Sequence, residues 1–172
     1  IGFVSQPGIG STFTMSLPCH YQTNELTQRC DAQNQTRSRA TKTLTILVVE
    51  DNPVNQLVVK GLLKKNGYDV LSASNGAEAL EKLAHHTIDM VLMDCQMPIM
   101  DGFETTRRIR NSDLDYQKIP IIAVTANAMS EDRHLCIQAG MNDYLCKPID
   151  AQILNRKVIY WANRPAQTRA VM

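Results

Sequence analysis

The chain has 172 residues, of which 44% are hydrophobic and 20% charged, and its formal net charge is +1 at pH 7. This length gives room for one ordinary domain with tails and excludes a multidomain enzyme. Because acidic and basic residues nearly cancel, we expect no nucleic-acid partner and no membrane contact, and any charge-driven function must be local.

The segments outside the main pattern have their own composition. No apolar run is long enough to span a bilayer, and the start, Ile-Gly-Phe-Val, lacks both an initiator Met and a signal-type apolar stretch. We therefore expect a piece of a longer protein. Residues 19–43 are rich in Gln, Asn, Thr, Ser and Arg and predict a flexible linker. A domain over 44–162 and a tail over 163–172 follow.

From residue 44 onward, short apolar runs alternate with amphipathic stretches, which is typical of repeated β-α units around a parallel sheet. The continuous apolar runs predict strands covered by helices on both faces, and therefore an α/β fold with an open, doubly wound, five-stranded parallel sheet. We expect strands at 44–49, 68–72, 90–93, 119–124 and 143–146, and helices at about 53–66, 76–84, 104–110, 131–139 and 150–161.

Two helices have further signals. Asn52 can cap the first helix, and Pro53 suits its first position. In this helix the residues at helical spacing are Val54, Leu57, Val58, Gly61 and Leu62. In the last helix we expect Trp161 to anchor the helix together with Ile153, Leu154 and Val158.

Polar residues follow four of the expected strands. Glu50 and Asp51 come after the first strand, Asp94 after the third, Thr125 after the fourth and Lys147 after the fifth. Because the carboxyl ends of parallel strands lie at one edge of the sheet, these side chains should gather there. Three clustered carboxylates repel one another unless a cation neutralises them, and oxygen ligands suit Mg²⁺.

This constellation predicts phosphoryl-transfer chemistry. An acyl phosphate is an accessible covalent intermediate for Asp, and we take Asp94 as the nucleophile. The transferred group needs its oxygens neutralised, which the metal, the Lys147 ammonium and the Thr125 hydroxyl can provide.

Four segments, "ILVVEDNPVNQ", "DMVLMDCQMPIMDGFE", "IIAVTA" and "DYLCKP", closely resemble the motifs of response-regulator receiver domains. The resemblance covers about residues 44–162 and includes all five strand-end residues in type, order and spacing. It implies a flavodoxin-like (βα)5 fold with strand order 2-1-3-4-5.

The resemblance also implies roles for individual residues. Asp94 would be the phosphoacceptor, and Mg²⁺ (or Mn²⁺) would be held by Asp94, by Asp51, by the Gln96 backbone carbonyl, and by Glu50 through water. Lys147 would pair with the phosphoryl group.

Two further features follow from the same resemblance. The peptide bond between Lys147 and Pro148 would be cis. Thr125 and Tyr144 would form the switch pair that reports phosphorylation.

A second resemblance lies at the N-terminus, where "GFVSQPGIGSTFTMSLP" looks like the last glycine-rich box and closing strand of a histidine-kinase ATP-binding domain. Residues 1–18 would be the remnant of that domain, and the parent would be a hybrid sensor histidine kinase, either inner-membrane-anchored or soluble. We expect residues 1–18 to be disordered or loosely packed, because the rest of their sheet is absent. The boxes of the ATP-dependent kinase core have no counterpart in the chain.

Three functions remain open at this point. The favoured one is a phosphorelay station that takes phosphate from a kinase phosphohistidine, promotes its own phosphorylation and passes the group to a histidine-containing phosphotransfer protein. A haloacid-dehalogenase-like phosphatase would need a second Asp two residues after Asp94, where Gln96 stands. The third is a docking module that is never phosphorylated. A weak homodimer is compatible with each.

Some residues also have structural interpretations. Glu50 could be a solvated carboxylate beside the metal, and Tyr144 a core-edge aromatic. His85 and His86 fall at an expected helix end, where solvated histidines favour the helix dipole. The five cysteines (Cys19, Cys30, Cys95, Cys136 and Cys146) are odd in number and never spaced C-x-x-C, which predicts reduced thiols in the cytoplasm, with Cys95 inert.

Overall fold

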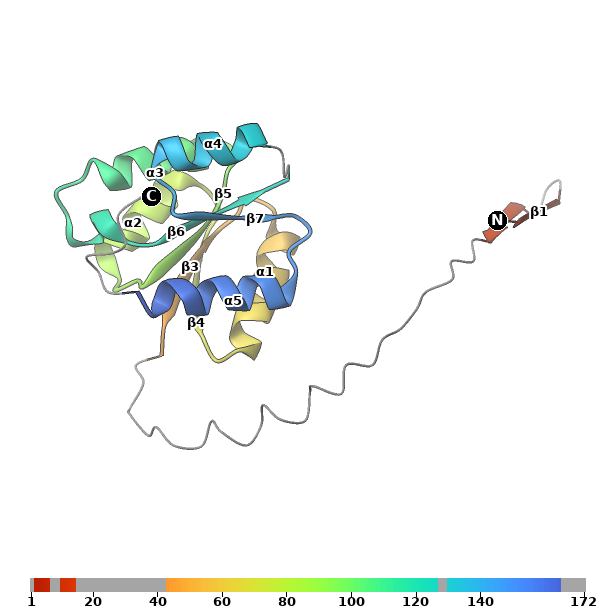
Figure 1. Ribbon diagram of the computed structural model, residues 1–172, viewed down its shortest axis with the longest axis horizontal. Helices are drawn as coiled ribbons and strands as arrows, with labels where there is room; N and C mark the ends of the chain where they lie inside the picture. Colours follow the sequence, from red (N-terminus) through yellow and green to blue (C-terminus); the bar gives the residue numbers. More distant parts are fainter. Residues whose placement is uncertain (1, 7–9, 15–42, 127–129, 165–172) are drawn as a thin grey trace. The chain divides into compact units, whose positions relative to one another are not determined.

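The computed structural model describes residues 2–6, 10–14, 43–126 and 130–164 (Figure 1). The chain divides into two units, Ile1–Thr41 and Lys42–Met172. In the first unit, strands β1 (Gly2–Gln6) and β2 (Gly10–Thr14) pair antiparallel, with Gly2 opposite Thr14. These two strands are therefore ordered by pairing with each other, and the other half of the expectation, loose packing, stays a prediction. The remaining residues of 1–18 lie outside the described part.

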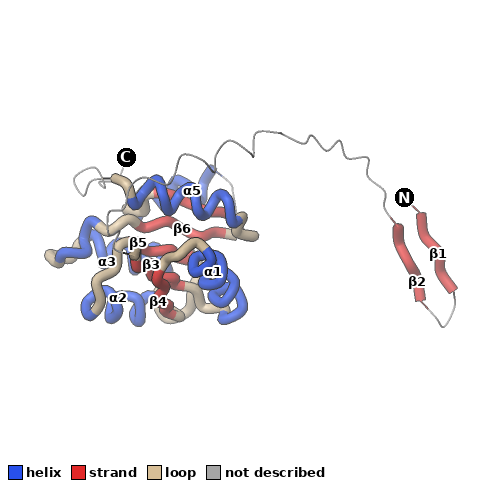
Figure 2. The backbone as a smooth tube through the Cα atoms, turned by 90° about the horizontal axis from the view of Figure 1, so that it is seen from below, coloured by secondary structure: helices blue, strands red, loops and turns tan. Residues whose placement is uncertain are grey.

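The second unit contains a five-stranded parallel sheet between two layers of helices (Figures 1 and 2). Its strands run in the order β4-β3-β5-β6-β7, which is the predicted order 2-1-3-4-5 within this unit. The strands are β3 (Thr45–Val49), β4 (Asp69–Ala73), β5 (Met90–Asp94), β6 (Ile121–Thr125) and β7 (Asp143–Cys146). The helices are α1 (Pro53–Lys65), α2 (Gly76–His85), α3 (Gly102–Arg110), α4 (Ser130–Ala139) and α5 (Ala151–Ala162), with a short 3₁₀ helix, η2 (Asp115–Lys118).

Each central strand contributes to two hydrophobic cores because successive side chains point to opposite faces. In β3, Ile46 and Val48 face α1 and α5, whereas Leu47 and Val49 face α2, α3 and α4. The first core is completed from the helices by Val59, Leu63, Leu154, Val158 and Trp161, and the second by Ala79, Leu83, Ile109 and Cys136. This double burial explains why the strands are continuous apolar runs.

Helix α1 begins where the sequence places a capping residue. Asn52 caps α1, its side-chain oxygen accepting from the backbone N–H of Val54 at 2.9 Å, and Pro53 takes the first helical position as predicted. At the other end Gly67 adopts a φ of 82°, which a residue with a Cβ rarely adopts. Among the described helices, none is long and apolar enough to cross a membrane.

The structure corrects the apolar patterns of two helices. In α1 the buried side chains are Val59 and Leu63, while Val54, Leu57 and Val58 are 67%, 71% and 54% exposed. The spacing was right for a helix, but the face that meets the sheet lies beside the one these three residues form. In α5, Leu154, Val158 and Trp161 are buried as expected, whereas Ile153 is 40% exposed.

Strand β6 begins two residues later than predicted. Pro120 has no N–H to donate to a neighbouring strand, and its carbonyl accepts from Val91 instead. The paired strand therefore starts at Ile121 and includes Thr125 as its last residue.

A half-buried arginine joins three segments on the α3–α4 side of the sheet. Arg110, the last residue of α3, donates to the carbonyl oxygens of Gln117 and Gly140 at 2.7 and 2.8 Å, and to Asn142 Oδ1 at 2.8 Å. Burial lowers its pKa to about 10, so it is still protonated at neutral pH. Its three hydrogen bonds fix the loops that lead into β6 and β7.

We predict that Arg110→Met, which keeps the apolar stem and removes the donors, lowers the free energy of unfolding by about 2–3 kcal/mol. Arg108→Met is the matched control, because the Arg108 side chain is 55% exposed and pairs with Glu104, whose side chain is 41% exposed. Its effect should stay within about 0.5 kcal/mol. Urea denaturation of the three proteins measures both values, and equal effects would contradict the anchoring role of Arg110.

Candidate functional site

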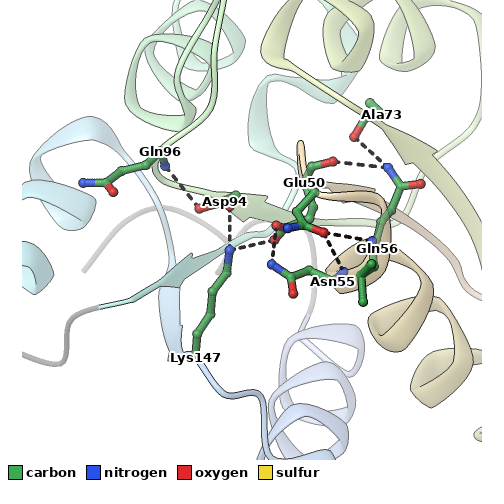
Figure 3. A network of polar contacts seen from close by, with 9 residues as sticks. Glu50, Asn55, Gln56, Ala73, Asp94, Gln96 and Lys147 are labelled. Carbon is green, nitrogen blue, oxygen red and sulfur yellow. Dashed lines mark hydrogen bonds and ion pairs between the residues drawn. The ribbon is translucent and has the colours of Figure 1, made fainter.

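The carboxyl ends of the parallel strands gather the predicted side chains around one hollow. Its volume is about 220 Å³, and it is lined by Glu50, Asp51, Asn52, Asn55, Asp94, Cys95, Gln96, Thr125, Ala126 and Lys147. All five strand-end residues of the sequence analysis are therefore neighbours, although they are far apart in the chain. Figure 3 shows how Glu50, Asp94 and Lys147 point toward one another.

The hollow carries more negative than positive charge. Glu50 and Asp94 are only 3% and 5% exposed, Asp51 is exposed, and one oxygen from each lies within 4.8 Å of the others. Lys147 Nζ lies 2.8 Å from Glu50 Oε2 and 2.6 Å from Asp94 Oδ2. Three carboxylates face a single ammonium in this hollow, so its net charge is negative. The hollow is also large enough for a divalent cation with bound waters. The donor set therefore fits Mg²⁺.

Burial and hydrogen bonding act in opposite directions on the two central groups. Burial raises the pKa of Asp94, and the nearby Glu50 charge adds to this, while hydrogen bonds from Lys147 and the Gln96 N–H offset part of the shift. For Lys147, burial lowers the pKa, but its hydrogen bonds to Asp94 and Glu50 outweigh burial and leave the pKa raised. Lys147 is therefore a firmly protonated ammonium held between two carboxylates.

Two carboxamides that the sequence analysis missed hold Glu50 in place. Asn55 Nδ2 donates to Glu50 Oε1 at 2.8 Å. Gln56 Nε2 lies 3.3 Å from both the Glu50 and the Ala73 carbonyl oxygens, so it ties the start of the site to the neighbouring strand (Figure 3). The interpretation of Glu50 as a solvated carboxylate is therefore wrong. The sequence signal that could have predicted this role is the pair of adjacent carboxamides, Asn55 and Gln56, in the first turn after Asn52.

Gln96 and Thr125 complete the hollow from the other strands. The Gln96 N–H donates to Asp94 Oδ1 at 3.2 Å while its side chain is exposed. Thr125, the last residue of β6, is buried and lines the hollow. That the Gln96 carbonyl binds metal stays a prediction.

Tyr144 lies outside this group. It sits on β7, half-buried, with the Arg133 guanidinium carbon 5.6 Å and Lys157 Nζ 5.4 Å from its ring centre. It lines a separate hollow together with Pro148. The Lys147–Pro148 peptide bond is cis.

The loop between β5 and α3 keeps the backbone close to Asp94. A Cβ on Gly102 would lie 2.2 Å from the Asp94 carbonyl oxygen, so only glycine allows α3 to begin there. In the same loop Ile99 has a φ of 71° and is 85% exposed. This backbone conformation costs a β-branched residue about 1–3 kcal/mol.

The remaining candidates lie elsewhere. His85 and His86 are exposed at the end of α2 and the residue after it, as the structural interpretation expected. Met90, Met93, Met97 and Met141 are buried among apolar neighbours. None of these lines the hollow at the carboxyl ends of the strands.

A family model described as "Response regulator receiver domain" matches residues 46–159. The sensor histidine kinase RcsC of Salmonella typhimurium is 39% identical over 127 residues, which are 74% of this chain and 13% of that protein. The sensor protein EvgS of Escherichia coli is 37% identical over 150 residues, 87% of this chain and 12% of that protein. The chain thus spans about an eighth of the curated relatives it matches.

Two solved structures are informative for the site. One is the receiver domain of the sensor histidine kinase PA1611 from Pseudomonas aeruginosa, with a magnesium ion coordinated in its active-site cleft: 43% identity, TM-score 0.67, covering 72% of this chain and all of that one. The other contains the Saccharomyces cerevisiae histidine phosphotransfer protein Ypd1 with the receiver domain of Ssk1: 29% identity, TM-score 0.64, covering 70% and 89% of the two chains.

We predict that Lys147→Met destabilises the metal-free protein, because Glu50 and Asp94 are then buried without a counter-ion. Since Lys147 is 25% exposed, we expect a loss of about 2 kcal/mol rather than the larger loss of a fully buried pair. Added Mg²⁺ should restore much of it. Urea denaturation in EDTA and in Mg²⁺ measures both effects.

Lys60→Met serves as the control, because Lys60 Nζ bonds the hydroxyl of Ser72, away from the site. Its effect should be below about 1 kcal/mol and independent of Mg²⁺. A Lys147→Met protein as stable as wild type in EDTA would show that the bridge is not what makes the buried carboxylates tolerable.

Proposed function

The chain belongs to the response regulator receiver domain family, and we propose that Asp94 is the residue on which it accepts a phosphoryl group from a phosphohistidine. The observation that carries the proposal is the Lys147 ammonium lying between the buried carboxylates of Glu50 and Asp94 at the mouth of an open hollow. Such an arrangement suits a nucleophile that must be ionised and whose product carries additional negative charge.

The residues of the hollow have distinct parts in this transfer. An Asp94 carboxylate oxygen attacks phosphorus as the phosphorus–nitrogen bond of the phosphohistidine breaks. The products are an acyl phosphate on Asp94 and a neutral histidine on the donor. Lys147 moves its ammonium from the carboxylate to a phosphoryl oxygen, and the Thr125 hydroxyl donates to another. The Gln96 N–H, 3.2 Å from Asp94 Oδ1, orients the nucleophile.

Mg²⁺ is the proposed cofactor, and Mn²⁺ has the same ligand preference. Asp51, Asp94 and the Gln96 carbonyl would bind it directly and Glu50 through a water. When bound, the ion neutralises the oxygens of the group in transit. The clustered carboxylates support this assignment.

The exposed apolar face of α1 supports a protein as phosphoryl donor and acceptor. Val54, Leu57 and Val58 stand on the helix whose cap, Asn52, lines the hollow. The protein that carries the phosphohistidine must lie close to this face of α1 when its histidine reaches Asp94. The exposed apolar side chains there can be buried by that contact. The proposed partners are a kinase phosphohistidine domain as donor and a histidine-containing phosphotransfer protein as acceptor.

Thr125 and Tyr144 are the proposed switch pair. Thr125 lines the acceptor hollow and Tyr144 lies on the neighbouring strand, so a hydroxyl drawn toward a phosphoryl oxygen would change the space beside the ring. Such a switch needs two states that differ by about a few kcal/mol.

The parent is proposed to be a hybrid sensor histidine kinase, either inner-membrane-anchored or soluble, whose receiver lies in the cytoplasm. In this proposal residues 1–18 are the end of its ATP-binding domain, 19–43 the linker, 44–162 the receiver and 163–172 the tail. The match to EvgS supports this organisation, because its 150 aligned residues exceed the 129 residues from 44 to 172. The similarity therefore extends into the N-terminal part.

A haloacid-dehalogenase-like phosphatase remains disfavoured. Position 96, where that chemistry needs an acid, carries an exposed glutamine side chain. The docking-module alternative is separated from the favoured function by the next experiment.

We predict that acetyl phosphate with Mg²⁺ adds a single phosphoryl group to the chain, detected by intact mass. EDTA and Asp94→Asn should each abolish the adduct, because one removes the metal and the other the nucleophile. Asp113→Asn, which changes an exposed carboxylate outside the site, should leave it intact. A folded chain without an adduct would favour the docking module.

We predict that Leu57→Glu slows transfer from a histidine-phosphorylated transfer protein by about tenfold or more, because one apolar contact is lost and a charge is buried. Labelling by acetyl phosphate should be unchanged. Leu114→Glu is the control. Leu114 is also exposed, but it precedes β6 and therefore lies toward the amino ends of the strands, away from the hollow. Equal rates for the two variants in rapid-quench assays would exclude α1 from docking.

A further inference from the structure

Two thiols meet directly behind the acceptor site. Cys95 follows Asp94 at the end of β5, Cys136 lies in α4, and their sulfur atoms are 3.7 Å apart. The side chains are 5% and 1% exposed, and they are not joined by a disulfide. This separation is van der Waals contact, and the two sulfurs must approach to about 2.05 Å to form a disulfide.

Only one of the two cysteines lines a hollow at the surface. Cys95 lines the acceptor hollow and also an adjoining hollow of about 500 Å³, whose other walls include Asp51, Met97 and Phe103. Cys136 lines neither of them. A reagent as small as hydrogen peroxide would therefore meet Cys95 before Cys136.

We propose that Cys95 and Cys136 are a modification site for small peroxides, which close the pair to a disulfide. The Cys95 sulfur attacks hydrogen peroxide, the O–O bond breaks, and a sulfenic acid and one water form. The Cys136 sulfur then displaces the sulfenic oxygen as a second water. In sum, two S–H bonds and one O–O bond are replaced by one S–S bond and two waters. This proposal is the alternative to the expectation that Cys95 is inert.

The backbone around Cys95 determines what must move. Its N–H donates to the Val124 carbonyl at 3.1 Å, and its own carbonyl accepts from Gly102 at 3.2 Å. Closure therefore comes from rotation of the thiols and a shift of α4 rather than from the strand. The bond would tie α4 to the residue that separates Asp94 from Gln96.

This position couples the modification to phosphorylation, a step that rests on the proposed function. Asp94 and Gln96 are both proposed metal ligands, and a side chain between them that is tied to α4 would disturb both. Oxidation is therefore expected to slow phosphorylation of Asp94 by about fivefold or more.

The full chain is treated with excess hydrogen peroxide, its remaining thiols are alkylated, and its peptides are mapped by mass spectrometry. The expected product is a linked peptide pair containing Cys95 and Cys136, which dithiothreitol separates, with Cys146 alkylated. Recovery of Cys95 and Cys136 only as separate peptides overturns the proposal. Mapping also separates this bond from any formed by Cys19 or Cys30.

Two variants sharpen the result. Cys136→Ser should leave a Cys95 sulfenic acid that dimedone captures, and Cys146→Ser should form the linked pair as wild type does. Linkage of Cys95 to Cys146 in Cys136→Ser at the wild-type rate would overturn the assignment of the partner thiol. Mapping in wild type does not depend on how either variant folds.

The coupling has its own measurement. Oxidised and reduced wild-type chains are compared with acetyl phosphate, and equal rates overturn the coupling. If the reduced chain takes no phosphoryl group at all, the proposed function fails instead, whereas the peptide map still decides whether the dithiol closes.

Discussion

The ammonium of Lys147 is the interaction on which the site depends. Burying Glu50 and Asp94 at the edge of an apolar sheet is unfavourable, and a single cation between them offsets their repulsion. Asn55 and Gln56 then fix Glu50 from the α1 side, and Gly102 lets the backbone of α3 close over Asp94 from the other. The result is a fixed cavity with excess negative charge, which suits a divalent cation. Such a cation and Lys147 could together neutralise the oxygens of a phosphoryl group.

The fold could be predicted because its signals are local and repeated. Apolar runs, caps such as Asn52 and the glycine after α1 each specify an element, and parallel strands then bring Asp94, Thr125 and Lys147 to one edge. What escaped prediction depends on packing between elements. Which side of α1 meets the sheet, and which polar groups Asn55 and Gln56 bond, follow from where the helix lies on its neighbours, and no periodicity records that.

The two cores make the acceptor edge a meeting point of separate layers. Glu50 and its amides belong to the α1 side, where the exposed apolar face lies, whereas Cys95 packs with α4 on the other side of the sheet. A partner approaching over α1 and a modification acting through α4 would therefore reach Asp94 from different layers. The two influences need not compete for the same surface.

Lys147 has one more property: it follows the last strand to join the sheet. Every other charged group of the site is earlier in the chain, and β7 pairs only with β6 at the sheet's edge. While the chain is being made, the carboxylates therefore exist before their counter-ion does. A growing polypeptide therefore cannot pair Lys147 with Glu50 and Asp94 until β7 has emerged, so the complete site forms only when almost the whole domain is available.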